Sequence, residues 1–332
     1  MKNLIIFGGG GYCSSILIPQ LLEKNYNVTV YDTFWYGKDH LPISPNLSLV
    51  EGDVRDIDLV SKSLQNQDSV LHLSCISNDT SFELDENLST SINLDSFEPI
   101  VIAAKEKGVS RFVFASSSSV YGVSEEPNVD ESHPLVPLTL YNKYKGMCEP
   151  LLFKHTDNNF TGVVFRPATV CGYSPRQRLD LSVNILTNFA VNKGKITVFG
   201  GDQLRPNLHI NDYADLCETL LTIDKSLIAN EIFNCGYQNM SIMDIALTVK
   251  KVVEELFPDK GEIKIEVTDS DDPRSYHISS EKIKNKINFV PKRSVEDAVR
   301  DLCDAFKNNL LPNSFDDDKF FNVRTMKKLE VK

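Results

Sequence analysis

The stretch Asn3–Asp32, NLIIFGGGGYCSSILIPQLLEKNYNVTVYD, decides the fold. A short apolar run at residues 4–6 precedes four consecutive glycines, Gly8–Gly11, and apolar residues then recur near helical spacing. This order predicts a strand, a tight turn and a helix. A second predicted strand, Asn27–Tyr31, ends at Asp32, about 20 residues after the glycines, where a dinucleotide-binding βαβ unit places its ribose-binding carboxylate.

The chemistry of this unit predicts the dinucleotide. Gly8 and Gly11 tolerate positive φ and let backbone amides approach a pyrophosphate, while the helix behind them offers unpaired N–H groups and a partial positive charge. The Asp32 carboxylate accepts hydrogen bonds from both ribose hydroxyls and repels a 2′-phosphate. The sequence therefore predicts NAD rather than NADP.

Strands and helices alternate through the first half of the chain. Further strands are predicted at residues 47–51, 69–73, 111–115 and 161–165, and long helices at 84–107 and 138–155, the latter kinked or ended early by Pro150. This pattern predicts an α/β fold with a Rossmann-type doubly wound parallel sheet. Ligands of such sheets bind beyond the carboxyl ends of the strands, where Asp32, Asp53, Ser74 and the serines 116–119 fall.

The regular alternation of strands and helices ends after Gly172, which predicts a smaller C-terminal α/β substrate domain. We expect an NAD-binding domain over residues 1–172 with a return segment at 205–235, and a substrate-binding domain over 173–204 and 236–313. The tail, 314–332, shows no clear periodicity and receives no predicted role.

Composition restricts the class of protein. A net charge of −11 over 332 residues argues against nucleic acid or an anionic membrane surface as a partner. The seven cysteines are scattered with no C-x-x-C pair, which is typical of reduced thiols and predicts neither a disulfide framework nor a metal site. Because no run resembles a signal peptide or membrane span, we expect a cytoplasmic protein.

A tyrosine and a lysine lie four residues apart on a predicted helix. Tyr141 and Lys145 therefore share one helical face, and an ammonium beside a phenol favours the phenolate. Ser117 lies after a predicted strand and is placed to orient a substrate hydroxyl. On its own, the Y-x-x-x-K spacing is more typical of a surface pair, and the functional interpretation depends on the motifs that accompany it.

The combined motifs FGGGGYCSS, GDV, HLSC, FVFASSSSVYG, YNKYK and FRPATVCG resemble the extended short-chain dehydrogenase/reductase family, in particular its NAD-dependent nucleotide-sugar epimerases and dehydratases. The resemblance runs from the first strand to about Asn309. It implies that Ser117, Tyr141 and Lys145 form the catalytic set. It also implies cofactor-binding roles for Gly8, Gly11, Tyr12, Cys13, Asp32, Asp53, Val54, Leu73, Ser74, Asn93, Ser116, Tyr141, Lys145 and Pro167.

The chain departs from the family pattern at two places. Ser14 occupies the position of the third glycine of the cofactor loop. Ser118 and Ser119 stand where the dehydratases of the family carry an Asp-Glu pair, so the chain lacks the carboxyl groups that eliminate water. This disfavours dehydration, and it also disfavours the decarboxylase variant, which expects a glutamate there.

The resemblance also implies a nucleotide-diphosphate sugar as substrate. Its expected contacts are Thr169, Arg178, Asn184, Arg205 and Arg274, with arginines on the diphosphate. Arg176 and Arg178 are equally compatible with solvated surface charge. The segment SPRQRLDLSVN is similar to a subgroup that includes nucleotide-heptose 4-dehydrogenases.

These features favour a nucleotide-sugar 4-epimerase that oxidises C4 to a transient ketone and returns the hydride to the opposite face. Two alternatives stay open at this point, a net 4-dehydrogenase or ketoreductase and a non-catalytic nucleotide-binding regulatory protein. The resemblance implies a homodimer. His72, at the end of a predicted strand, is expected to be a packed and hydrogen-bonded side chain rather than a base.

Overall fold

The computed structural model describes residues 2–124, 126–269 and 275–331. Within these ranges, seven parallel strands form one sheet in the order β10-β6-β5-β4-β1-β2-β3. The predicted Rossmann-type doubly wound sheet is confirmed. The strand order reverses between β1 and β4, which is where such sheets bind ligands. The strands are β1 (Asn3–Phe7), β2 (Asn27–Asp32), β3 (Leu47–Glu51), β4 (Ser69–His72), β5 (Arg111–Ala115), β6 (Thr161–Pro167) and β10 (Glu231–Cys235).

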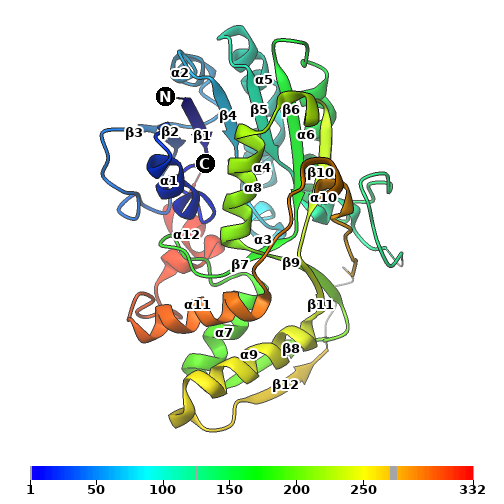
Figure 1. The fold of residues 1–332 in the computed structure, drawn as a ribbon. Helices are drawn as coiled ribbons and strands as arrows, with labels where there is room; N and C mark the ends of the chain where they lie inside the picture. The colour runs from blue at the N-terminus through cyan, green and yellow to red at the C-terminus, as the bar shows by residue number, and fades with distance from the viewer. Residues whose placement is uncertain (1, 125, 270–274, 332) are drawn as a thin grey trace.

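Helices cover both faces of this sheet (Figure 1). Side chains of β1 alternate between the faces: Leu4 and Ile6 join the core beneath α1 and α8, while Ile5 and Phe7 join the core beneath α2, α5 and α6. Strands buried on both faces need this continuous apolar character. The helices are α1 (Ser14–Glu23), α2 (Ile57–Ser63), α3 (Asp79–Phe82), α4 (Glu86–Thr90), α5 (Phe97–Glu106), α6 (Leu140–Phe153), α8 (Ile210–Thr222) and α10 (Glu281–Ile287).

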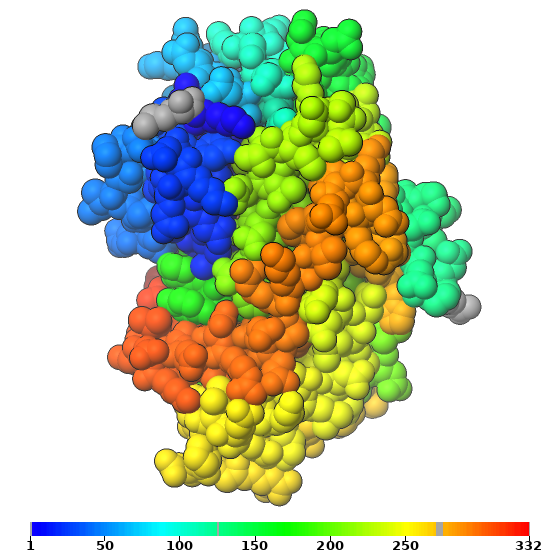
Figure 2. Space-filling model, viewed as in Figure 1, coloured from blue at the N-terminus to red at the C-terminus, as the bar shows by residue number. Residues whose placement is uncertain are grey.

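A second group of elements lies beyond the carboxyl ends of the strands and fills the lower half of Figure 2. In the described part of the chain it contains a three-stranded sheet, β11-β9-β7, and a parallel pair, β8 and β12. Its separate apolar core is formed largely by α7, α9 and α11. The elements are β7 (Thr169–Cys171), β8 (Lys195–Phe199), β9 (Leu204–His209), β11 (Gln238–Ser241), β12 (Lys264–Thr268), α7 (Ser182–Lys193), α9 (Ile242–Leu256) and α11 (Val295–Lys307).

The chain returns from this lower group to the main sheet. Helix α8 packs against α1, and β10 pairs with β6 at the sheet edge. The exact domain boundaries expected from the sequence stay a prediction. Short 3₁₀ turns complete the structure at η2 (Ser118–Tyr121), η3 (Lys225–Leu227), η4 (Pro258–Lys260) and η5 (Asp318–Phe320). No helix of the described residues combines the length and apolar content needed to cross a bilayer.

One helix prediction was wrong in detail, and of the two outcomes expected of Pro150, an early end of the helix is excluded. The expected single helix over 84–107 is divided into α4, a π-helical turn η1 (Ser91–Asp95) and α5. Pro99 has no N–H to donate, and it fits the first turn of α5, where no intrahelical partner is needed. Pro150 does not end α6 early, because Leu152 is fully buried and the backbone N–H of Lys154 bonds to the Pro150 carbonyl.

The tail that showed no periodicity folds against the rest of the molecule. It contains helix α12 (Asn322–Leu329), which packs against α3. Phe320 and Phe321 are buried with Leu179 and Leu302, and Met326 joins the core beneath α5. The tail is therefore part of the wall around the site described next.

Candidate active site

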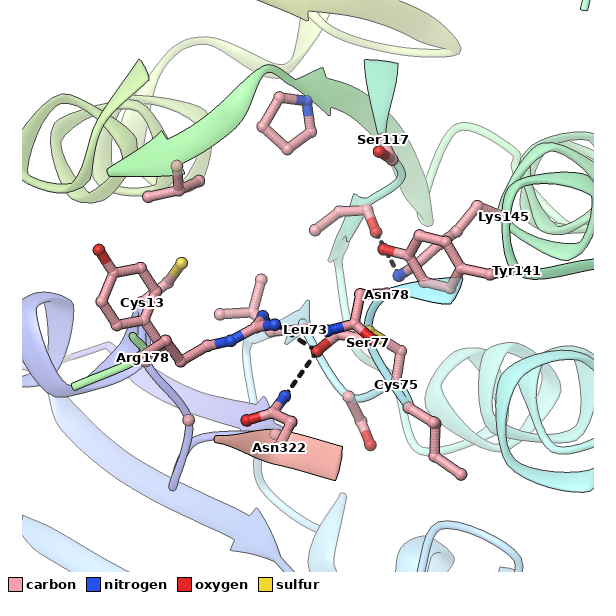
Figure 3. Close-up of a pocket in the computed structure, with 18 of the residues that line it drawn as sticks. Cys13, Leu73, Cys75, Ser77, Asn78, Ser117, Tyr141, Lys145, Arg178 and Asn322 are labelled. Carbon is pink, nitrogen blue, oxygen red and sulfur yellow. Dashed lines mark hydrogen bonds between the residues drawn. The ribbon is translucent and has the colours of Figure 1, made fainter. Parts of the chain in front are cut away.

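A cavity of about 600 Å³ lies over the carboxyl ends of β1, β2, β4, β5 and β6. Figure 3 shows that its wall brings together side chains from the glycine turn, the loop after β4, helix α6, the loop before α7 and the tail. Parallel strands thus place their carboxyl-end residues around one space, as the topology predicts.

The glycine turn forms one end of this cavity. Gly8 has φ +79°, and a Cβ added there would lie 2.6 Å from the backbone nitrogen of Ser74, so only glycine fits. Ser14, the departure from the third glycine, is buried and its hydroxyl donates to the Gly8 carbonyl (2.9 Å). Serine therefore supports the turn through a hydrogen bond.

Asp32 lies at the same end. Its carboxylate accepts hydrogen bonds from the backbone N–H groups of Gly10 (2.9 Å) and Phe34 (2.8 Å). Burial raises the Asp32 pKa, and these two hydrogen bonds oppose the rise. Each oxygen can still accept a further hydrogen bond, as a ribose-binding carboxylate must.

The expected reaction residues lie at the other end. Lys145, on α6, is buried and donates to the Ala115 carbonyl (2.8 Å), and its Nζ lies 5.0 Å from the centre of the Phe114 ring. Tyr141 lies one helical turn earlier and also lines the cavity. The helix begins at Thr139, whose hydroxyl accepts from the Asn142 backbone N–H (3.3 Å). Local capping thus fixes the start of the helix that carries the pair.

The pKa of Tyr141 is raised well above its ordinary value. Burial is the largest cause, Cys75 and Asp79 add to it, and Arg178 opposes it. Without a further positive charge nearby, Tyr141 therefore holds its proton at neutral pH.

Ser117 belongs to a chain of hydroxyl groups. Its Oγ lies 2.7 Å from Ser119 Oγ, and Ser119 Oγ donates to Asn142 Oδ1 (2.5 Å). Ser118 Oγ lies 3.4 Å from the hydroxyl of Tyr276. The two positions after Ser117 thus carry neutral hydroxyl groups that are held by neighbours.

A buried ion pair between Arg166 and Glu149 binds the first of the serines 116–119. Arg166 on β6 makes two hydrogen bonds with the Glu149 carboxylate, of 2.9 and 2.6 Å, and both side chains are almost wholly buried. Ser116 Oγ donates to the same carboxylate (2.6 Å). Burial opposes the charge on Arg166, but the carboxylate outweighs it and raises the Arg166 pKa.

Two arginines of the loop before α7 enter the cavity, and the alternative that they are solvated surface residues is wrong. Arg178 forms two hydrogen bonds with Asp180 (2.9 and 3.1 Å), and its Nη1 donates to Ser77 Oγ (3.1 Å). Arg176 lies 3.8 Å from the centre of the Tyr36 ring. Both side chains are buried and line the cavity.

Most of the expected binding residues line the cavity. They are Gly8, Gly11, Tyr12, Cys13, Asp32, Asp53, Val54, Leu73, Ser74, Ser116, Pro167, Thr169, Arg178 and Arg205. Asn93 and Asn184 are not among the described residues that line the cavity. Arg274 lies outside the described residues.

The two asparagines bond to residues of the cavity wall, and their expected direct contacts stay a prediction. Asn93 exchanges hydrogen bonds with the backbone N–H (2.8 Å) and carbonyl (2.9 Å) of Ile76. Asn184 Oδ1 accepts from the Gly172 N–H (3.0 Å), and its Nδ2 donates to the Arg178 carbonyl (2.8 Å). These bonds occupy both side-chain amides.

Sequence reasoning missed a number of lining residues, Tyr36, Ser77 and Asn322 among them. Asn322 comes from the tail and donates to Ser77 Oγ (3.1 Å), as Figure 3 shows. The tail offered no motif or periodicity that could have indicated this contact.

The residues present fit a dinucleotide. The glycine turn packs against the Ser74 backbone so closely that Gly8 has no room for a Cβ, and the Arg176 side chain is buried with Nε and Nη1 unpaired among the described residues. A buried guanidinium with unpaired N–H groups favours an anion such as a phosphate. Together with Asp32, the turn and the parallel sheet define a dinucleotide-binding α/β enzyme.

Comparison with known proteins identifies the family. Residues 4–236 match the model of the NAD dependent epimerase/dehydratase family, and the chain belongs to it. The chain is 26% identical over 323 residues to UDP-glucuronic acid decarboxylase 1 of Arabidopsis thaliana, covering 93% of this chain and 71% of the relative. It is 25% identical over 347 residues to UDP-glucose 4-epimerase of Lactobacillus helveticus, covering 96% and 100%.

A solved structure agrees with this assignment. UDP-glucuronic acid 4-epimerase from Bacillus cereus, in complex with UDP-glucuronic acid and NAD, superposes with a TM-score of 0.81 at 25% identity, covering 93% of this chain and 100% of that one. The protein is thus an enzyme of the extended short-chain dehydrogenase/reductase family with NAD as its cofactor.

Proposed function

We propose that the protein is a nucleotide-sugar 4-epimerase that works through a transient 4-keto sugar. The observation that carries the proposal is that Ser117, Tyr141 and Lys145 share one cavity with the glycine turn and Asp32 at one end, and with two arginines of the substrate side, Arg178 and Arg205. The epimerases among its relatives and structural neighbours support the same chemistry.

In this proposal, bound NAD supplies a reversible hydride acceptor. Tyr141 accepts the proton of the C4 hydroxyl and later returns it, and Ser117 orients that hydroxyl. Lys145 is fixed by the Ala115 carbonyl and favours the tyrosinate electrostatically. If the 4-keto sugar rotates within the cavity before the hydride returns, the hydride adds to the opposite face of C4 and the product is the C4 epimer.

Dehydration is the less favoured outcome. Elimination of water from a sugar needs an acid and a base at the neighbouring carbons, and Ser118 and Ser119 carry only hydroxyl groups. The Ser119 hydroxyl is already bound to Ser117 and Asn142. Decarboxylation is disfavoured because the decarboxylases of the family are expected to carry a glutamate at this position, where this chain has a serine.

The substrate side is proposed to bind the nucleotide diphosphate. Arg205 on β9 and Thr169 on β7 line the cavity from the second group of elements. Arg178 also lines the cavity, with its charge shared with Asp180. Arginine suits a diphosphate because its fixed N–H fork matches the phosphate oxygens.

A homodimer in the cytoplasm completes the proposal. The outer faces of α5 and α6 expose Ile102 and Met147, apolar side chains that a second copy would cover. The cysteines of the described chain are all free, in keeping with a reducing compartment.

The second candidate is a net 4-dehydrogenase, favoured by the similarity of SPRQRLDLSVN to nucleotide-heptose 4-dehydrogenases. The test is to incubate the purified protein with UDP-, GDP- and dTDP-sugars while following reduced cofactor by absorbance and products by NMR. We expect a C4 epimer with no net NADH. Stoichiometric NADH with a keto sugar would identify the dehydrogenase, and a 4-keto-6-deoxy product would overturn both.

A further inference from the structure

Asn322 lies at the start of the tail helix α12 and is 4% exposed. Its position is fixed by the packing of the tail: the Leu179 N–H donates to the Phe320 carbonyl (2.9 Å), and Phe321 is buried in the same apolar cluster. The side chain therefore enters the cavity wall from a well-packed segment.

Asn322 connects three residues of the cavity. Its Oδ1 accepts from Arg176 Nη2 (2.7 Å), its Nδ2 donates to Ser77 Oγ (3.1 Å), and its backbone N–H donates to Asp180 Oδ2 (3.3 Å). One residue thus joins the tail to the loop after β4 and to the loop before α7.

Two contacts orient the Arg176 guanidinium: the hydrogen bond to Asn322 and the face of the Tyr36 ring. Among the described residues, Asn322 Oδ1 is the one acceptor for its guanidinium, and Nε and Nη1 have no protein partner. Burial lowers the Arg176 pKa to about 10, which leaves the side chain charged at neutral pH. Its neighbours Tyr36 and Asp32 belong to the cofactor end of the cavity.

The other end of α12 reaches the same end of the cavity. Leu329, Glu330 and Val331 line a smaller hollow together with Trp35 and Asp53, which also line the main cavity. The tail helix thus extends from the arginine loop to the cofactor end.

We propose that Asn322 is a positioning residue that holds Arg176 toward the cofactor end of the cavity and thereby slows the release of NAD. This inference rests on the cofactor and is independent of which sugar is converted. Loss of one hydrogen bond to a buried charge predicts a change of about ten-fold or more in the release rate.

The test measures release of the fluorescent analogue etheno-NAD from the loaded full-length protein after mixing with excess NAD. Asn322→Ala is expected to release the analogue at least ten-fold faster than the unchanged protein. The matched control is Lys327→Ala, an exposed residue on the same helix, which should leave the rate unchanged. Equal rates for Asn322→Ala and the unchanged protein would overturn the proposal.

A double-mutant cycle separates positioning from general weakening of the tail. If Asn322 acts through Arg176, Asn322→Ala has no further effect in an Arg176→Ala background. Independent, multiplying effects would contradict the proposal. Asn322→Ser, which keeps a polar residue at the helix start but is too short for both contacts, gives the same answer should Asn322→Ala fail to fold. The assay contains no sugar, so its failure differs from failure of the proposed 4-epimerase activity.

Discussion

At the scale of single residues, the site separates side chains that face the cavity from those that hold its walls. Tyr141, Lys145 and Asp32 line the space, whereas Asn93 and Asn184 bond to backbone groups behind it. The side chains that line the cavity are thus held in place by amide groups that do not themselves line it.

Replacing Tyr141 by phenylalanine should remove the proposed base while keeping the ring. We expect kcat to fall by about 10²–10⁴-fold, the usual contribution of a positioned general base. NAD affinity should stay within a few-fold, and titration of the cofactor-free protein measures it. Unchanged turnover would reject Tyr141 as the base.

Cofactor binding should release a proton. In the cofactor-free protein burial raises the pKa of Tyr141, and a cationic nicotinamide ring nearby lowers it. A group whose pKa falls on binding loses its proton, so NAD affinity should rise with pH. Calorimetry in buffers of different ionisation enthalpy measures the proton release. Its persistence in Tyr141→Phe would assign the proton to another group.

Asp32→Ala should weaken the preference for NAD over NADP, because the carboxylate that repels a 2′-phosphate is gone. The ratio of kcat/KM or of binding constants for the two cofactors reports this. An unaltered ratio would mean that Asp32 does not meet the ribose.

His72 should make the stability of the protein depend on pH. It was expected to be packed and hydrogen-bonded, and the first part is right, but neither ring nitrogen has a hydrogen-bond partner among the described residues. The ring lies among Phe7, Phe97, Phe112 and Phe114, and burial lowers its pKa to about 3. The apolar surroundings thus keep the imidazole neutral.

The folded pKa of His72 lies below its unfolded value of about 6.5, so the unfolded chain binds the extra proton between these values. The stabilisation is present above pH 6.5 and is lost as pH falls, by up to about 1.4 kcal/mol per pH unit. His72→Phe should reduce the slope of the unfolding free energy against pH between about pH 3 and 6.5. Urea unfolding at a series of pH values measures this slope. An identical slope in the variant would contradict the assignment.

At the scale of elements, periodicity and glycine chemistry predict the strands of the main sheet well. Sequence pattern fails where tertiary contacts decide the backbone, as in the division of 84–107 around the π-helical turn, where Asn93 clamps Ile76. It also fails for α12, which packs against the distant helix α3. The positions of Arg176 and Arg178 could not be predicted from the sequence, because they are decided by contacts with residues far away in the chain. These are Tyr36, Ser77 and the tail residue Asn322.

The ion pair between α6 and β6 should contribute strongly to stability. Glu149→Ala leaves Arg166 buried without its carboxylate, so we expect a loss of about 3–5 kcal/mol in unfolding free energy. The matched control is Glu281→Ala, which breaks an exposed i,i+3 pair and should cost less than about 1 kcal/mol. Similar losses for both variants would contradict the burial argument.

At the scale of the whole molecule, the reaction depends on the space between the main sheet and the elements below it. The sheet supplies the cofactor end and the proposed reaction residues, and the lower elements supply Arg205 and Thr169. The division into a cofactor part and a substrate part stays a prediction from the motifs of each part. The identity of the proposed sugar could not be predicted, because the cavity walls come from loops without a regular pattern.

The most direct test follows a deuterium label from C4 of a sugar nucleotide that the enzyme converts. If the protein is a 4-epimerase, the same bound cofactor returns the label, and NMR should show the C4 epimer with deuterium retained and no label in free cofactor. Deuterium in released NADH, with an unreduced keto sugar as product, would contradict the account and assign a net dehydrogenase.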